Sequence, residues 1–342
     1  MGKVELDAAA LRASAAGLVV SLTTVSGELV FPALPACAGA YTQQLLDTFA
    51  AAGRGFDESE ARALRVAVDK WVAHGFERSP QASLRVTYRT DPDKPALLRW
   101  NVASVVPTSP AAQGDRANQG PLFDGPPDAR LLKLARSLGA RSHTTFLDVG
   151  ALHGRNAIAL ARLGHPTDAL EPVPEVAAVL RERAEVAGVV LSVVGGDFWD
   201  EGLSLPRARY RLVSVSEPWS RLRGMTPLRA LFRRLGQVLE PSGVALVPMF
   251  VARPGYLPEP ASREVAEARR SPVYTRDEVE AAAFGQSLEL VSDDSALAYE
   301  RAHGDPFPPA PWFEAWASGR HVFDLPAAAP PFELRWLVYR RV

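Results

Sequence analysis

Short apolar runs alternate with amphipathic helical patterns along the C-terminal part of the chain. Between these runs, hydrophobic positions recur with helical spacing, as in the segments that follow Gly154 and Pro227. Alternating strands and helices of this kind are typical of a parallel sheet that is covered by helices on both faces. The runs that predict strands are residues 144–150, 167–171, 191–197, 210–218, 243–251, 288–295 and 332–342. We therefore expect an α/β fold with a Rossmann-like, doubly wound, seven-stranded sheet.

The N-terminal part has a different pattern. Residues 57–75 place apolar side chains on one helical face, Asp57 and Glu60 have the spacing of a capping box, and Gly75 supplies a stop. Residues 83–90 and 97–106 alternate apolar and polar positions around turn-forming residues, which predicts a β-hairpin. These elements indicate a smaller α+β domain.

The segment from Pro107 to Asp128 is rich in Pro, Gly, Asn, Gln and Asp and has no apolar periodicity. We place the domain boundary there, with an accessory or substrate-binding domain at 1–125 and the α/β domain at 126–342. Within the latter, residues 298–331 carry aromatic residues and many prolines. We interpret this segment as a lid-like insertion, with a packed excursion as an equally good alternative.

Three acids close consecutive predicted strands. Asp148 comes just before the glycine-containing turn with Gly150 and Gly154, and a helix follows that turn. Such a turn lets the backbone approach a ligand, and the helix start presents free N–H groups. Glu171 closes the next strand, where a carboxylate can accept hydrogen bonds from both hydroxyls of a ribose. After the third strand, Asp197 can accept from an exocyclic amine while the ring of Phe198 flanks an adenine.

These strand ends, in this order and at these spacings, resemble the class I S-adenosylmethionine-dependent methyltransferases. The resemblance implies that S-adenosylmethionine is the cofactor and that Asp148, Gly150, Gly154, Glu171 and Asp197 bind it. Leu152 stands where many members have a glycine, which requires that its backbone keeps a negative φ. A nicotinamide dinucleotide site is disfavoured, because its glycine pattern is not met after Gly150.

The fourth predicted strand ends in Ser216, Glu217, Pro218 and Trp219. In the resemblance, these residues stand where amine and amide methyltransferases often carry an Asn- or Asp-Pro-Pro-aromatic motif, and the match is partial. It slightly favours N-methylation over O-methylation. Glu217 is a candidate base or amine-binding group, or else a structural acid. Trp219 is a candidate pocket wall, or else a core aromatic. His153 is a further candidate catalytic residue, or else a solvated histidine in the turn.

The composition of the chain restricts the classes of partner that we expect it to bind. Lys plus Arg number 38 against 39 Asp plus Glu, so no basic field exists to attract nucleic acid or a membrane surface. The single cysteine, Cys37, and six scattered histidines predict no metal site and fit a cytoplasmic protein. No apolar segment of the sequence is long enough to predict a membrane span. Arginines around the helix after Pro227 are expected on its solvated face.

The resemblance therefore implies a methyltransferase, which we expect to act on a small molecule or a peptide-derived natural product in biosynthesis. An aminopropyltransferase-like enzyme and a nonenzymatic binding protein that retains the fold stay open as alternatives. The methyl acceptor, the role of the N-terminal domain and a homodimeric state are left undecided.

Overall fold

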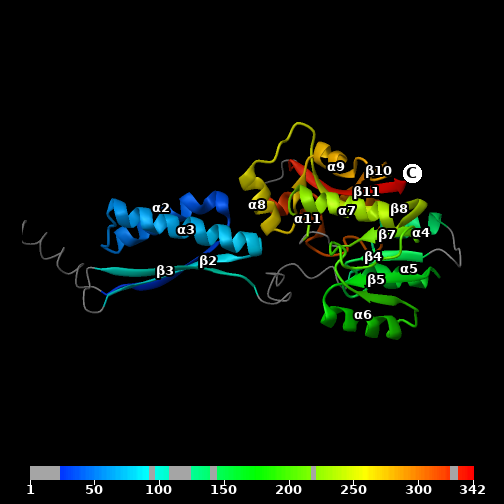
Figure 1. Ribbon diagram of the computed structural model, residues 1–342, viewed down its shortest axis with the longest axis horizontal. Helices are drawn as coiled ribbons and strands as arrows, with labels where there is room; N and C mark the ends of the chain where they lie inside the picture. Colours follow the sequence, from blue (N-terminus) through cyan, green and yellow to red (C-terminus); the bar gives the residue numbers. More distant parts are fainter. Residues whose placement is uncertain (1–23, 92–96, 108–124, 139–144, 217–220, 324–329) are drawn as a thin grey trace, which may run out of the picture. The chain divides into compact units, whose positions relative to one another are not determined.

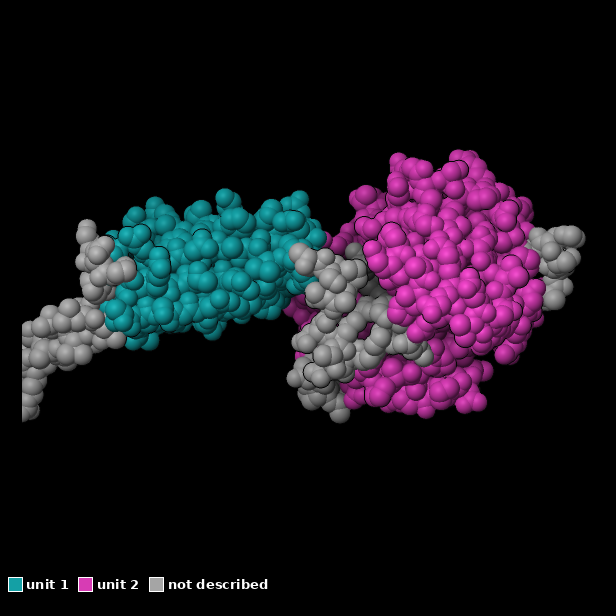
Figure 2. All heavy atoms as spheres, turned by 90° about the horizontal axis from the view of Figure 1, so that it is seen from below, with its two compact units in different colours: residues 1–114 teal, residues 115–342 magenta. Residues whose placement is uncertain are grey.

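The computed structural model describes residues 24–91, 97–107, 125–138, 145–216, 221–323 and 330–342. The chain divides into two compact units, Met1–Gly114 and Asp115–Val342, which are coloured separately in Figure 2. The division falls before the predicted boundary at 125/126. Among the described residues, no helix has the length and apolar character needed to cross a membrane.

The N-terminal unit is a three-stranded antiparallel sheet packed against two long helices (Figure 1). Its elements are β1 (Ser26–Pro32), η1 (Pro35–Cys37), α2 (Ala38–Ala51), α3 (Glu58–Arg78), β2 (Ser83–Thr90) and β3 (Leu98–Val105). The predicted hairpin is present as the β2–β3 pair. Leucine, valine and phenylalanine side chains from α2 and α3 form the core with the inward positions of the strands.

Helix α3 begins with the predicted capping box, in which the side chains of Asp57 and Glu60 each accept the other residue's backbone N–H. The sequence predicted that this helix stops at Gly75, but the helix continues to Arg78. A Cβ atom at Gly75 would lie 3.0 Å from Cβ of Ser104 and 3.1 Å from Cβ of Ala33. This glycine therefore allows the helix to pack closely on the sheet.

The C-terminal unit is built on one large sheet with the strand order β10-β11-β8-β7-β4-β5-β6 (Figure 1). Its strands are β4 (Thr145–Val149), β5 (Thr167–Glu171), β6 (Ser192–Gly195), β7 (Tyr210–Val215), β8 (Leu239–Ala252), β9 (Val273–Tyr274), β10 (Leu288–Ser295) and β11 (Phe332–Arg341). Strands β4 to β8 pair in parallel, and β11 runs antiparallel to both β8 and β10. The two-residue strand β9 pairs with β8 and gives the sheet an eighth strand, one more than predicted.

Helices cover both faces of this sheet, which confirms the doubly wound α/β class. They are α4 (Ala129–Ser137), α5 (Arg155–Arg162), α6 (Pro174–Val186), α7 (Met225–Val238), α8 (Pro260–Ala268), α9 (Arg276–Ala283), α10 (Ala296–His303), α11 (Phe313–Ala317) and α12 (Arg320–Phe323). One core joins α7 and α9 to the sheet, and another lies under α4, α5, α8 and α11. Apolar positions on single helix faces account for both cores.

The described part of the predicted lid-like insertion is a packed layer. Phe313 and Trp316 are buried in the core under α11, and Nε1 of Trp316 donates to Oγ of Ser271 at 3.2 Å. Apolar aromatic rings gain more from burial against the sheet than from exposure to solvent. The buried side chains of α11 are therefore packed against the sheet, and the lid-like role of residues 298–331 stays a prediction.

The arginines of α7 were all expected to face solvent, and this is wrong for one of them. Arg234 is 8% exposed and donates to the backbone carbonyls of Asp200 and Leu203 at 3.0 and 2.9 Å. Its guanidinium also lies over the ring of Phe198, 5.4 Å from the centroid. A buried arginine is tolerated here because two carbonyl oxygens accept its hydrogens.

Candidate functional site

The strand order reverses between β4 and β7, and the carboxyl ends of the strands next to this switch point carry polar side chains. From β4 the chain proceeds outward to β5 and β6, and then returns to β7 on the other side of β4. Asp148 lies in β4, Glu171 ends β5, and Asp197 follows β6 by two residues. The three predicted acids therefore lie at or just after the carboxyl ends of three adjacent parallel strands, at the edge where open α/β sheets bind ligands.

The turn after β4 is shaped by two glycines with positive φ. A Cβ atom at Gly150, where φ is 72°, would lie 2.4 Å from the carbonyl oxygen of Ser216. At Gly154, where φ is 89°, a Cβ atom would lie 2.4 Å from Cδ1 of Leu180. Both positions favour glycine because their φ angles are positive, and at Gly150 a Cβ atom would also meet backbone.

Leu152 departs from its prediction. It has a φ of 50°, in the left-handed region, rather than the expected negative value. Its backbone N–H donates to Oε2 of Glu171 at 3.0 Å. The loop thus keeps the path that a glycine would take, and the leucine bears a conformational cost of about 1–2 kcal/mol.

Glu171 is almost fully buried and holds two backbone segments together. Its Oε2 accepts the N–H of Leu152, and its Oε1 accepts the N–H of Val173 at 3.0 Å. Burial raises the pKa of this carboxyl, and the two backbone donors oppose that rise. Each oxygen accepts one of these bonds, so each has acceptor capacity left for a further donor such as a ribose hydroxyl.

Asp148 is completely buried. Its Oδ1 accepts a hydrogen bond from Oγ of Ser216 at 2.8 Å, whereas its Oδ2 has no hydrogen-bond partner among the described residues. Burial raises the pKa of Asp148 to about 7, against the lowering effects of Ser216 and of the positive charge on Arg155. A buried acceptor without a donor is costly, so this oxygen is a natural contact for a ligand donor or a bound water.

Asp197 is partly exposed and already has partners. Its Oδ1 accepts the backbone N–H of Trp199 at 3.0 Å, and its Oδ2 forms an ion pair with Arg221. Phe198 is only 1% exposed and belongs to the core under α7, with its ring against Trp199. The ring therefore presents almost no surface in this structure, and its predicted contact with adenine stays a prediction.

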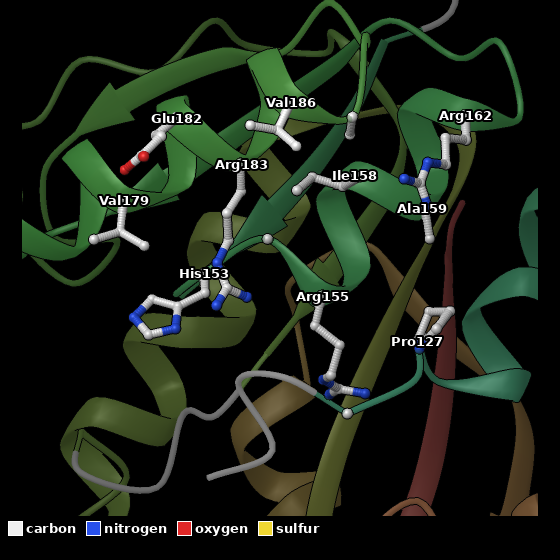
Figure 3. A pocket seen from close by; sticks show the side chains of 13 residues that line it. Pro127, His153, Arg155, Ile158, Ala159, Arg162, Val179, Glu182, Arg183 and Val186 are labelled. Carbon is white, nitrogen blue, oxygen red and sulfur yellow. The ribbon is translucent and has the colours of Figure 1, made fainter. Parts of the chain in front are cut away.

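His153 lies in the turn after β4 but faces a groove between α5 and α6 (Figure 3). The groove has a volume of about 630 Å³, and its wall includes Arg155, Arg162 and Arg183. Figure 3 shows the His153 ring beside Arg183, toward α6. Neither Asp148 nor Glu171 lines this groove, and the catalytic role of His153 stays a prediction. Glu217 and Trp219, the other two candidate catalytic residues, lie outside the described residues.

Ser216, the first residue of the partial motif after β7, joins the site through hydrogen bonds, together with two polar residues to which the sequence gave no role: Asn156 and Asp128. Asn156 is 1% exposed, although it stands in the first turn of a helix. A buried amide needs several partners, but the sequence gives no sign of which distant segments supply them. Asp128 and Ser216 are separated from Asn156 by 28 and 60 positions.

Comparisons with known proteins give matches in structure but not in sequence. No family model matches the chain, and no relative is found among curated proteins. The chain is similar in structure to a candidate sarcosine dimethylglycine methyltransferase from Galdieria sulphuraria, at 19% identity and a TM-score of 0.46, over 62% of this chain and 84% of that one. It is also similar to geranyl diphosphate C-methyltransferase from Streptomyces coelicolor A3(2), at 16% identity and a TM-score of 0.46, over 63% and 79% of the two chains.

A third match is the [4+2]-cyclase SpnF, at 18% identity and a TM-score of 0.43, over 62% of this chain and 80% of that one. Since these similarities are distant, the strand order and the strand-end geometry carry the assignment of the fold. The C-terminal unit has the doubly wound α/β fold that the resemblance to class I S-adenosylmethionine-dependent methyltransferases implies.

Proposed function

We propose that the C-terminal unit binds S-adenosylmethionine and transfers its methyl group to a small molecule or a peptide-derived natural product. The observation that carries the proposal is the placement of Asp148, Glu171 and Asp197 on three adjacent strand ends beside the switch point. In a mainly parallel sheet this is the edge where ligands bind, and the three carboxyls offer acceptors at successive places along it.

The residues fit this cofactor chemically. Glu171 would accept the ribose hydroxyls with the lone pairs that Leu152 and Val173 leave unused. Asp148 would take up the positively charged amino group of the cofactor with Oδ2, directly or through a water. Asp197 would accept from the exocyclic amine of the adenine beside its bond to Trp199. The left-handed turn at Gly150 and Leu152 brings backbone close to the same edge.

When bound, S-adenosylmethionine would supply an electrophilic methyl group on a sulfonium, which leaves as a neutral thioether, and an amine acceptor would release a proton. The protein therefore has to align the acceptor, exclude water and, where needed, receive that proton. We propose Glu217 for the proton and slightly favour nitrogen over oxygen as the acceptor atom, because the residues Ser216 to Trp219 after β7 partly match the motif that the resemblance implies for amine and amide methyltransferases.

The ribose role of Glu171 gives the test. Glu171→Ala removes the acceptor, and we expect it to weaken binding of S-adenosylmethionine by about 1–3 kcal/mol in calorimetry. Glu182→Ala, at an exposed position of α6, is the matched control and should bind like the wild type. Thermal unfolding should show that both variants are folded. Unchanged affinity in a folded Glu171→Ala variant would contradict the assigned role.

A further inference from the structure

A chain of buried and partly buried hydrogen bonds connects the segment before α4 to the carboxyl group of Asp148. Nδ2 of Asn156 donates to Oδ2 of Asp128 at 2.8 Å and to Oγ of Ser216 at 2.9 Å. Ser216 in turn donates to Oδ1 of Asp148 at 2.8 Å. The four residues come from four separate parts of the chain, so only the folded unit brings them together.

The orientation of the Asn156 amide is determined by its partners. Both hydrogens of Nδ2 are used, and Oδ1 accepts the backbone N–H of Asp128 at 3.0 Å. A flipped amide would place its oxygen against the carboxylate of Asp128 and its nitrogen against that N–H. Since the partners exclude this arrangement, Asn156 always presents a donor to Ser216.

This fixed donor sets the direction of the next hydrogen bond. A serine hydroxyl has one hydrogen, and Oγ of Ser216 already accepts from Asn156. Its own hydrogen is then available for Oδ1 of Asp148, and the second oxygen, Oδ2, keeps its full acceptor capacity. The nearby hydroxyl of Ser214, 3.4 Å from Oγ of Ser216, is a weaker alternative.

The side chain of Asp128 takes part in this chain of hydrogen bonds and does not cap its own helix. It occupies the N-cap position of α4, but its side chain makes no capping bond. Both of its oxygens are instead held by the guanidinium of Arg155, in the fork geometry that fixes a carboxylate in place. Glu300, from α10, accepts the N–H groups of Ala129 and Arg130 and so replaces the missing cap.

We propose that Asp128 and Asn156 are positioning residues of the cofactor site, which fix the hydroxyl of Ser216 so that Asp148 offers a free acceptor to the amino group of the cofactor. This inference rests on the proposed function. It predicts that the chain of hydrogen bonds affects the amino-acid end of the ligand and leaves the adenosine end unaffected. A chain that only stabilised the fold would affect both ends alike.

The test is Asn156→Asp, which keeps the shape of the side chain and replaces its donor by an acceptor. The new oxygen faces the carboxylate of Asp128, so thermal unfolding must first show that the variant is folded. The hydroxyl of Ser216 should then turn toward residue 156, so that Asp148 loses its donor. Binding of S-adenosylhomocysteine, which has the amino group, should weaken about tenfold, a change of about 1.4 kcal/mol. Binding of 5′-methylthioadenosine, which lacks the amino-acid end, should stay within about twofold of the wild type.

Three further variants complete the experiment. Ser216→Ala removes the link itself and should reproduce the selective loss, which keeps the test available if Asn156→Asp does not fold. The double variant, Asn156→Asp with Ser216→Ala, should bind S-adenosylhomocysteine no more weakly than the single variant with the lower affinity. Both substitutions interrupt the same chain of hydrogen bonds. Asn101→Asp makes the same chemical change at an exposed position in β3 and should leave both affinities unchanged.

Equal weakening of both ligands would assign the chain to fold stability alone, and unchanged binding of S-adenosylhomocysteine in folded variants would also overturn the positioning role. A wild-type protein that binds neither ligand would instead contradict the proposed function. The two failures are therefore distinguishable.

Discussion

The backbone N–H of Leu152 donates to Oε2 of Glu171 at 3.0 Å, although Leu152 has to adopt a φ of 50° to do so. The bond joins the turn after β4 to the end of β5, across two neighbouring strands. A left-handed residue other than glycine is unfavourable, and such residues persist where the surrounding structure determines them. The pair therefore links a local conformational cost to the residue proposed to bind ribose.

This relationship predicts the relative stability of two variants. Leu152→Gly and Leu152→Ala both remove the leucine side chain, but only alanine keeps the cost of the left-handed backbone. We expect the glycine variant to exceed the alanine variant in free energy of unfolding by about 1 kcal/mol, as measured by denaturant titration. An alanine variant that is equally or more stable would show that residue 152 does not have a left-handed backbone.

The burial of Asp148 predicts a dependence of stability on pH. Burial raises its pKa from an ordinary 3.8 to about 7. Between these values the folded state holds a proton that the unfolded chain has lost, so the free energy of unfolding falls as the pH rises. The loss is complete above about pH 7, and stability recovers as the pH falls toward 4.

Asp148→Asn removes this titration. We expect the wild type to lose up to about 1.4 kcal/mol per pH unit between about pH 5 and 6.5 from this group, and the variant to lose correspondingly less. Glu300, whose pKa burial also raises to about 7, contributes to both proteins and cancels in the difference. Glu182→Gln, at an exposed site, should retain the wild-type slope; equal slopes for Asp148→Asn and the wild type would contradict the buried, titrating carboxyl.

Glu217 should separate binding from turnover. It follows Ser216 in the sequence and lies outside the described residues. If it orients or deprotonates the methyl acceptor, Glu217→Gln should leave affinity for S-adenosylmethionine within about twofold and lower kcat/KM for the true acceptor by about tenfold or more. Steady-state kinetics beside cofactor titration measure both quantities. Full activity would leave Glu217 a structural acid and turn the search for a base to the histidines.

The sequence predicted the local features of the fold because their causes are local. The capping box at Asp57 is present with both reciprocal hydrogen bonds, and the apolar runs of the C-terminal unit form strands. Each of these depends on residues within a few positions of one another. The two-residue strand β9 was missed, since two residues carry no periodicity.

Features that depend on distant contacts were misread. Gly75 was interpreted as a helix stop, but a side chain at this position would lie too close to Ala33 and Ser104 in other elements. Arg234 was assigned to solvent, although carbonyls after β6 accept its hydrogens. A glycine or an arginine has the same local pattern in either environment, and only the tertiary fold decides between them.

The same distinction applies to the candidate site. The three acids could be identified because each ends an apolar run, and the strand order then places them on adjacent strands. Asn156 and Asp128 gave no such signal, because their importance lies in hydrogen bonds between segments that meet only in the folded unit.

The most direct test of the account is a calorimetric titration of the 342-residue chain with S-adenosylmethionine, with S-adenosylhomocysteine and a nicotinamide dinucleotide as comparison ligands. We expect one binding site that accepts both S-adenosyl compounds and does not bind the dinucleotide. Absence of binding by either S-adenosyl compound to the folded protein, or preferential binding of the dinucleotide, would contradict the central claim.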